Sequence, residues 1–361
     1  MAKASIEKRP SSILAVHSGA LGDVILFGRL LELLSAPAGV TLVAGGEKAR
    51  LLAGLGVVGR AMDFDALPMH DIFTDSPADP GRLANLLGKH DRLVSCFAAG
   101  DSRAQMRLAL ACGADQAAFL PIRPDEGFHG HLVELWCDLM GVACGMGILS
   151  MRDRGVSPLS LASSSSEQQQ QDRAGTALER TGKMPVPRFA AWPVPLAWRK
   201  QARAALKELG LPASRPIVIH VGAGAREKCW PLENFISLGW QLVSQDSRRA
   251  PVVFVLGPAE LERLDKPLLA ELRKNFPVLE EPPLETLAGV LATCRTYIGN
   301  DSGVSHLAAA VGAPTLALFG PTNPRHFAPL GPSVKIVAAE NMRAISVQRV
   351  WDEVGNVERG E

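Results

Sequence analysis

Residues 299–322 of the chain, GNDSGVSHLAAAVGAPTLALFGPT, place three polar side chains ahead of a long run of small apolar residues. Ser302 is a favoured residue at the start of a helix, and Gly303 lets a ligand approach the free backbone N–H groups of the first turn. Asp301 stands before this start, and His306 follows within the first turn, where its ring stays near the loop. His306 by itself is as consistent with a structural histidine as with a ligand contact. The segment predicts a polar, amide-rich turn that suits a sugar diphosphate better than an apolar ligand.

A second glycine-rich turn follows the apolar run IVIHV, in the sequence IVIHVGAGAREKCWPLENF. Gly222 and Gly224 allow backbone N–H groups to approach an anion, and Pro231 suits the first turn of the next helix, whose N-terminus favours negative charge. The segment lacks the Gly-Lys-Ser/Thr ending of a P-loop and the spacing of the dinucleotide-binding fingerprint. Lys228 stands just before the helix. A lysine in a surface loop is usually only solvated, but this position makes Lys228 a candidate phosphate ligand.

A third turn lies near the N-terminus, in HSGALGDVILFGRLLELL, where Gly19 and Gly22 allow a tight loop. Asp23 falls where the following helix begins, and two interpretations are open. As an N-cap, Asp23 would bond the free N–H groups of the first turn. At the end of the first strand, it could instead act as a general base towards an acceptor hydroxyl group.

The composition restricts the kind of protein to which these turns belong. The 361 residues exceed one typical domain and predict two domains, each with its own core. With 38 basic and 37 acidic residues, the formal net charge is +1, and aromatic residues make up 5% of the chain. Neither a large field that attracts polyanions nor a base-stacking surface is expected, so nucleic acid is not a predicted partner. Any phosphate site must be local.

The cysteines and the N-terminus give no sign of metal, disulfide or membrane-spanning chemistry. The six cysteines form no CxxC pair and no cluster with histidines, which predicts reduced thiols and no metal site. The N-terminal MAKASIEKRPSS has no apolar core, and no uninterrupted apolar stretch approaches membrane-spanning length. We therefore expect a cytoplasmic protein with no transmembrane segment and no cofactor.

Apolar runs alternate with helical patterns in both halves of the chain, which predicts an α/β fold with parallel sheets and helices on both faces. Strand-like runs lie at 12–17, 41–45, 92–97, 217–221, 251–257, 296–300 and 315–320. Helical patterns lie near 24–34, 47–55, 131–142, 196–209, from 231, 259–275 and 303–311. Two such doubly wound domains facing one another place a ligand between them, at the carboxyl ends of their strands.

The character of the sequence changes between the two halves. Residues 163–171 read SSSSEQQQQ, and a proline-rich stretch follows, with too little apolar surface to offset the entropy of ordering. We therefore expect an N-terminal domain at 10–150, a low-complexity insertion and linker at 151–195, and a C-terminal domain at 196–340. A final helix within 341–361 is expected to pack back on the first domain.

Together, the three turns resemble glycosyltransferase family 9, the heptosyltransferase family of lipopolysaccharide core assembly. DSGVSHLAAAVGAPTLALFGPTNP looks like the family's C-terminal signature, HVGAGAREKCWP is similar to its nucleotide-side loop, and GALGDVI is similar to its N-terminal motif. The resemblance covers nearly the whole chain apart from the Ser/Gln insertion. It implies a GT-B fold, in which the first domain mainly binds the acceptor and the second binds the nucleotide-sugar. It also implies an inverting reaction that needs no metal.

The resemblance implies roles for particular residues. Asp23 matches the family's proposed base, and Lys228 its phosphate-binding lysine. An acidic residue after the strand at 251–257 commonly meets the nucleotide ribose, and either Glu260 or Glu262 could serve. The donor-binding set implied in this way is Gly222, Gly224, Lys228, Glu260, Asp301, Ser302, Gly303 and His306.

Three functions are consistent with these residues. The leading one is an inverting, metal-independent glycosyltransferase that moves a heptose-like sugar from an ADP-heptose-like donor to a lipopolysaccharide core, or to another lipid-linked or polysaccharide acceptor, with peripheral contact to the inner face of the inner membrane. A nucleotide-sugar epimerase of the same fold would need acid and base groups on both faces of one sugar, and the second turn offers Lys228 without a paired carboxylate. A non-catalytic nucleotide-sugar-binding protein is favoured by SCFAAGD at 95–101, where family members frequently have a polar segment, and opposed by Asp23.

Overall fold

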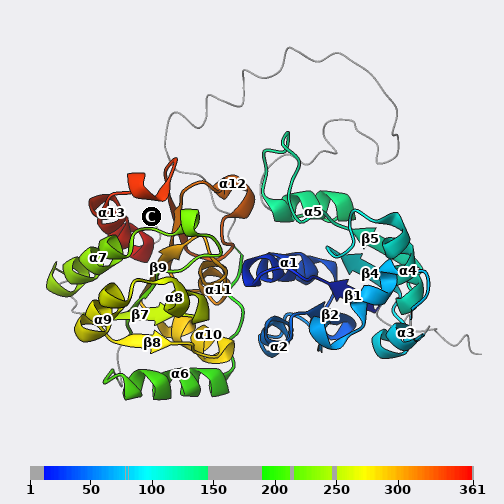
Figure 1. Cartoon of the computed structure of the whole chain (residues 1–361), viewed down its shortest axis with the longest axis horizontal. Helices are drawn as coiled ribbons and strands as arrows, with labels where there is room; N and C mark the ends of the chain where they lie inside the picture. Colours follow the sequence, from blue (N-terminus) through cyan, green and yellow to red (C-terminus); the bar gives the residue numbers. More distant parts are fainter. Residues whose placement is uncertain are drawn as a thin grey trace, which may run out of the picture.

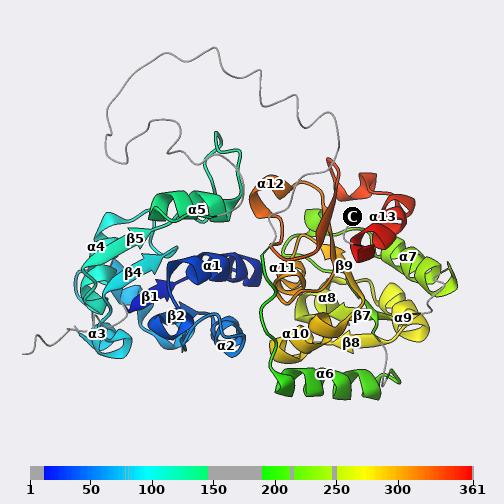
Figure 2. The ribbon, with the colours of Figure 1, turned by 180° about the vertical axis from the view of Figure 1, so that it is seen from behind.

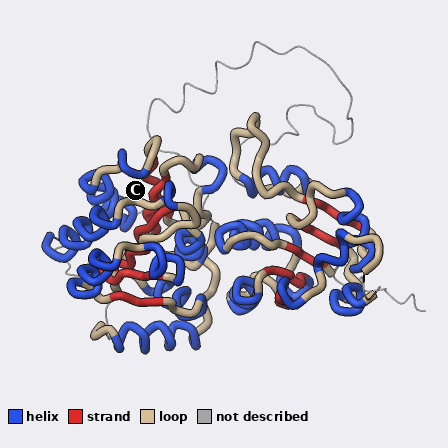
Figure 3. The backbone as a smooth tube through the Cα atoms, viewed as in Figure 1, coloured by secondary structure: helices blue, strands red, loops and turns tan. Residues whose placement is uncertain are grey.

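The fold consists of two parallel β-sheets, each with helices on both faces (Figures 1 and 3). The structure, a computed structural model, describes residues 12–77, 79, 81–144, 189–211, 215–245 and 250–359. The predicted α/β fold with two Rossmann-like halves is confirmed. The predicted insertion at 163–171 and most of the linker at 151–195 lie outside the described residues, so the domain boundaries stay predictions.

The first sheet has the strand order β3-β2-β1-β4-β5, with β1 at its centre. Its strands are β1 (Ile13–Val16), β2 (Val40–Ala44), β3 (Arg60–Asp63), β4 (Arg92–Ser95) and β5 (Gln116–Phe119). One face packs against α1 (Leu21–Leu34), α2 (Gly46–Gly54) and α5 (Leu132–Met140), and the other against η3 (Met69–Phe73), α3 (Arg82–Leu87) and α4 (Ser102–Cys112). The turn from β1 to α1 therefore lies at the middle of the carboxyl edge, where ligands bind in open α/β sheets.

The second sheet has the order β11-β10-β9-β6-β7-β8. Its strands are β6 (Ile217–His220), β7 (Val252–Leu256), β8 (Val278–Glu280), β9 (Thr296–Asn300), β10 (Thr315–Phe319) and β11 (Val334–Ala338). One face packs against α10 (Leu284–Thr293) and α11 (Gly303–Ala310), with α6 (Leu196–Glu208) against α10, and the other packs against α7 (Leu232–Gln245), α9 (Lys266–Asn275) and α13 (Val347–Arg359). The short helices η6 (Arg226–Lys228), α8 (Pro258–Arg263), α12 (Pro324–Phe327) and η7 (Met342–Ala344) follow strands β6, β7, β10 and β11.

The central strands read as continuous apolar runs because both of their faces are buried. In β7, Val253 and Val255 join one apolar cluster, whereas Phe254 and Leu256 join another on the opposite face. Successive side chains of a strand point to opposite faces, so a five-residue apolar run fills two cores.

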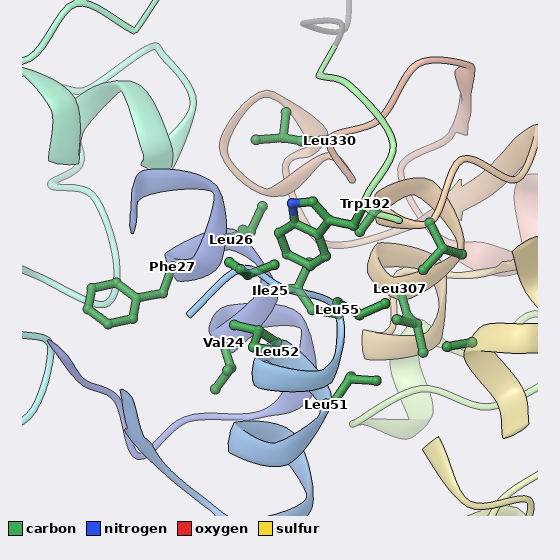
Figure 4. Close-up of a cluster of buried hydrophobic side chains, with 14 of the residues drawn as sticks. Val24, Ile25, Leu26, Phe27, Leu51, Leu52, Leu55, Trp192, Leu307 and Leu330 are labelled. Atoms are coloured by element: carbon green, nitrogen blue, oxygen red, sulfur yellow. The ribbon is translucent and has the colours of Figure 1, made fainter. Parts of the chain in front are cut away.

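One apolar cluster extends across both domains. It contains Ile25 and Leu26 of α1, Leu307 of α11, and Trp192, which precedes α6. Figure 4 shows the Trp192 ring close to Leu26 and to Leu330, with residues from both halves of the chain around it. Because these side chains are almost completely buried, the two domains share part of one core.

The C-terminal helix packs on the second domain, and the expectation that residues 341–361 return to the first domain is wrong. Helix α13 lies beside α7 (Figures 1 and 2). Val350, Val354 and Val357 form one apolar stripe and join the cluster between α7 and the second sheet. That face of the sheet has apolar residues to cover, and α13 covers them.

Residues 259–275 form two helices instead of the predicted one. Helix α8 ends at Arg263, and α9 begins at Lys266 after Asp265, whose side chain accepts a hydrogen bond from the N–H of Leu268. Pro267 lies in the first turn of α9, where a missing N–H group costs nothing. The N-cap and the proline together start a new helix.

Candidate active site

The N-termini of α1 and α11, one from each domain, are in contact (Figures 1 and 2). A Cβ atom at Gly303 would lie 2.7 Å from Cβ of Leu21, and a Cβ atom at Gly22 would overlap the ring of His306. Side chains do not approach so closely, so both positions need glycine at this separation. The contact brings the turn that carries Asp23 beside the turn at 301–306.

Asp23 is half-buried at this contact and occupies the third position of α1. The interpretation of Asp23 as the N-cap is wrong, because the N-cap is Ala20, whose C=O already accepts from the N–H of Val24. One carboxylate oxygen of Asp23 accepts a hydrogen bond from the N–H of Ala20 at 3.1 Å, as the acidic residue of a capping box does. The carboxylate also acts electrostatically on His306 of the other domain.

Lys228 and Asp301 form an ion pair at the carboxyl edge of the second sheet. Nζ of Lys228 lies 2.8 Å from Oδ2 of Asp301. Asp301 follows β9 and is 8% exposed, whereas the Lys228 side chain is 33% exposed. This contact brings the loop that carries Lys228 beside the turn at 301–306. An incoming diphosphate would compete with Asp301 for the ammonium group of Lys228.

Ser302 is the N-cap of α11, as predicted, and its Oγ accepts from the N–H of Ser305 at 3.5 Å. His306 lies one turn further along and is buried. Burial lowers the pKa of His306, although the carboxylates of Asp301 and Asp23 oppose this effect. Its Nδ1 atom has no hydrogen-bond partner among the residues that the structure describes. A neutral, buried imidazole with one unpaired nitrogen therefore lies at this turn, against Gly22 of α1.

Gly222 and Glu260 are in contact, and both line a pocket of about 680 Å³ together with Trp230, Leu264 and Met342. A Cβ atom at Gly222 would coincide with the carboxylate of Glu260, so only glycine fits beside it. The same carboxylate accepts from the N–H of Gly257 at 2.8 Å. This pocket follows strands β6 and β7, at the ends of which the donor residues were expected.

His220, at the end of β6, connects this pair to the turn at 301–306. Its Nε2 atom lies 3.7 Å from Oε2 of Glu260, and its Nδ1 atom lies 3.5 Å from Oγ of Ser302. Burial raises the pKa of Glu260, but the interaction with His220 and the N–H of Gly257 outweigh it, and the net pKa is lowered. Glu260 is therefore a carboxylate at neutral pH, ready to accept from a hydroxyl group.

Two of the predicted residues, Gly224 and Glu262, are exposed and lie outside these contacts. Gly224 is exposed, and a Cβ atom there would meet open space, so its packing does not require glycine. Glu262 is exposed on α8 and does not line the pocket, whereas Glu260 does. Of the two acidic candidates for the ribose, Glu260 has the better position.

Asn300 holds the loop between Val221 and Trp230, a role that sequence analysis missed. Its amide group donates to the C=O of Val221 at 2.8 Å, and its Oδ1 atom accepts from the N–H of Trp230 at 3.0 Å. Asn300 is fully buried and joins both ends of the segment that carries Lys228. An asparagine at the buried end of a strand was the only available signal, since a strand interior offers few partners for an amide.

The segment SCFAAGD forms the turn from β4 to α4. Asp101 is the N-cap of α4 and accepts from the N–H groups of Arg103 and Ala104. Ala98 has a φ of 61°, a left-handed conformation that is unusual for a residue with a side chain. Cys96 is buried, and burial together with the charge of Asp23 raises the pKa of its thiol. This segment therefore lies beside the candidate base.

The described residues contain neither a metal-ligand cluster nor a membrane-spanning helix. In the described part of the chain, no three or more His, Cys, Asp and Glu side chains are grouped as metal ligands would be. Over the same residues, no helix has the length and apolar character needed to cross a membrane.

Two Rossmann-like domains whose strands end at one shared interface define a GT-B fold, the fold of many glycosyltransferases. A structure of a family 9 glycosyltransferase from Veillonella parvula matches it with a TM-score of 0.66 at 18% identity, covering 97% of this chain and 98% of that one. A structure of the E. coli heptosyltransferase WaaC with ADP-2-deoxy-2-fluoro heptose matches with a TM-score of 0.57 at 19% identity, covering 96% and 99%. At these identities the likeness shows the fold.

The chain belongs to glycosyltransferase family 9 (heptosyltransferase), whose family model matches residues 165–353. The lipooligosaccharide heptosyltransferase 2 of Haemophilus influenzae is similar, with 31% identity over 161 residues. That match covers 41% of this chain and 44% of the relative, so it spans less than half of the relative's length.

Proposed function

We propose that the protein is an inverting, metal-independent glycosyltransferase that moves a heptose-like sugar from an ADP-heptose-like donor to a lipopolysaccharide core or another glycan acceptor. The observation that supports this most is the contact between α1 and α11, with Asp23 on one side and the turn at 301–306 on the other. A hydroxyl nucleophile and a leaving diphosphate need a base and a positive group on opposite sides of one sugar.

The second domain would hold the donor. The Lys228 ammonium group and the N-terminus of α11, with Ser302 and Gly303, would face the diphosphate. Glu260 would accept from the ribose hydroxyl groups at the edge of the pocket beside Gly222. An ADP-heptose analogue bound to the E. coli enzyme of the same fold supports this class of donor.

The first domain would bind the acceptor. Asp23 would take the proton of the attacking hydroxyl group, while Lys228 and the α11 N–H groups stabilise the negative charge that grows on the diphosphate. His306 would lie between the donor and the acceptor. Its ring contacts Gly22, and the charges of both Asp23 and Lys228 act on its pKa. A lipid-linked acceptor would require peripheral contact with the inner face of the inner membrane.

The donor part is tested by thermal unfolding with a panel of nucleotide-sugars. A ligand at 100 times its Kd adds about 2.7 kcal/mol of stability. ADP-heptose should raise the unfolding temperature more than UDP- or GDP-sugars, and Glu260→Gln should reduce the rise. An equal rise in unfolding temperature with all nucleotide-sugars would contradict the proposal that the donor is an adenine nucleotide-sugar.

The reaction is tested by incubation with ADP-heptose and heptose-free lipopolysaccharide, followed by mass spectrometry of the glycan and determination of the new anomeric configuration. We expect one added heptose, an inverted anomer and full activity in EDTA. Donor binding without transfer to any acceptor of a glycan panel would favour the non-catalytic binding protein. Conversion of the donor sugar without acceptor would favour an epimerase.

A further inference from the structure

We propose that Lys48 is a positioning residue that holds the carboxylate of Asp23 through the single peptide group between Gly19 and Ala20. Nζ of Lys48 donates to the C=O of Gly19 at 2.7 Å. The N–H of Ala20, on the other side of the same peptide bond, donates to Oδ2 of Asp23 at 3.1 Å. The inference rests on the proposed role of Asp23 as the base.

The two contacts are coupled by the geometry of the peptide group. A peptide unit is planar, and in the trans form its C=O and N–H bonds point in opposite directions. The described chain contains no cis peptide bond, so the Lys48 cation and the Asp23 carboxylate lie at opposite ends of one peptide dipole. Each charge polarises the peptide in the direction that strengthens the other hydrogen bond.

The preceding peptide group, between Ser18 and Gly19, is also held in place. The N–H of Gly19 donates to Nδ1 of His17 at 2.9 Å. A Cβ atom at Gly19 would lie 2.5 Å from Cε1 of His17 and 2.9 Å from Oδ2 of Asp23. The backbone of Gly19 thus fits between the imidazole ring and the carboxylate, and Lys48 closes the remaining direction. Asp23 cannot keep this position if the peptide rotates.

His17 is in its neutral form, which this arrangement requires. Its ring is buried, and burial lowers its pKa to about 4, although Asp23 opposes the effect and Lys48 adds to it. The imidazole is therefore neutral at pH 7, and a neutral ring can accept at Nδ1, whereas a charged ring cannot. His17 and Lys48 hold the two ends of the Gly19 residue without competing for one atom.

The fold explains why Lys48 is available. Strands β1 and β2 are neighbours, so the turns that follow them lie side by side at the carboxyl edge of the sheet. Lys48 is in the first turn of α2, beside Glu47, whose carboxylate accepts from the N–H of Leu284 in the second domain at 3.0 Å. The first turn of α2 thus contacts both the loop before α1, through Lys48, and the second domain, through Glu47.

The test compares Lys48→Met and Lys48→Arg with the control Arg50→Met, an exposed cation on the same helix. Turnover is measured with ADP-heptose and heptose-free lipopolysaccharide, and hydrogen exchange of the Ala20 N–H is measured in the free protein. A small displacement of a reacting group costs about 100-fold in rate, so Lys48→Met should lower kcat by about 10- to 100-fold. Lys48→Arg should recover much of this loss, with Kd for ADP-heptose and the Arg50→Met variant unchanged.

The exchange measurement separates this inference from the proposed function. In Lys48→Met the Ala20 N–H should exchange faster than in Arg50→Met, by up to about fivefold, whether or not transfer is detected, because loss of one partner weakens the other hydrogen bond. Unchanged exchange, or an equal loss of kcat in Lys48→Arg and Lys48→Met, overturns the inference. Faster exchange with full activity of Asp23→Asn would retain the coupling and reject Asp23 as the base.

Discussion

A Cβ atom on Gly22 would lie 2.9 Å from Cδ2 of His306, so a glycine of the first domain fits against a histidine of the second. The two residues belong to the first turns of α1, which carries Asp23, and of α11, which begins within the turn at 301–306. Their separation sets how closely the candidate base approaches the turn at 301–306.

Gly22→Ala should therefore weaken the docking of the two domains. An added methyl group in a closely packed contact costs about 1 to 3 kcal/mol, which exceeds the gain of up to about 1 kcal/mol for alanine over glycine in a helix. We expect a lower thermal unfolding temperature and a reduced kcat. Gly100→Ala is the control, because a Cβ atom there meets open space. An equally stable and active Gly22→Ala would mean that the contact is not maintained in solution.

Arg29→Met should destabilise the protein strongly. Arg29 is buried in α1 and donates to the C=O groups of Ala310 and Leu330 in the second domain, and its guanidinium group lies 4.3 Å from the Trp192 ring. Arg29 also pairs with Glu32 at 2.9 Å, and loss of a buried hydrogen bond from a charged group costs about 1.5 to 3 kcal/mol. Denaturant unfolding of Arg29→Met and of the exposed control Arg103→Met should differ by about this amount. A difference below about 1 kcal/mol would contradict a role for Arg29 in joining the domains.

Lys228→Ala should weaken donor binding without loss of folding. A hydrogen bond to a charged group contributes about 1.5 to 3 kcal/mol, which corresponds to roughly 10- to 150-fold in Kd. Titration calorimetry with ADP measures this, and the exposed Lys274→Ala on α9 is the control. Equal affinities for ADP in the two variants would remove Lys228 from the diphosphate site.

Stability should fall as the pH is lowered from about 6.5 to 4. Burial lowers the pKa of His131 from 6.5 to about 4, against a smaller opposing effect of its bond to the C=O of Ala328. In this window the unfolded chain binds a proton that the folded chain excludes, so this stabilisation is complete above pH 6.5 and lost towards pH 4. One such group accounts for about 3 kcal/mol. Denaturant unfolding of His131→Gln should show a flatter pH dependence than the parent, and identical slopes would refute this assignment.

Much of the fold could be predicted because the central strands are buried on both faces and read as apolar runs. Strands β3, β5 and β8, which are short and partly exposed, gave no such signal. Local helix-start chemistry identified Ser302 correctly as a cap. It left Asp23 open between a cap and a base, and the cap interpretation is wrong, because the sequence of a glycine-rich loop does not fix where the first helical hydrogen bond forms.

The contacts that join the residues of the site depend on partners distant in the sequence. Lys228 and Asp301 are 73 positions apart, and Asn300 bonds a loop 70 to 79 positions away. The spacing of residues along the chain does not predict such pairs, because the order of the strands in the sheet brings the residues together. Glu260 could have been preferred over Glu262 by its spacing of three from Gly257, the spacing of a capping box, which turns its carboxylate back towards the strand end.

The most direct test of the central claim is the single-turnover rate of Asp23→Asn with ADP-heptose and heptose-free lipopolysaccharide. Asparagine can accept the same hydrogen bond from Ala20 but cannot take a proton, so the fold and the Kd for ADP-heptose should be retained. The account predicts a rate about 10²- to 10⁴-fold below that of the parent, the range for loss of a general base. A folded Asp23→Asn protein that transfers heptose at the parent rate would contradict it.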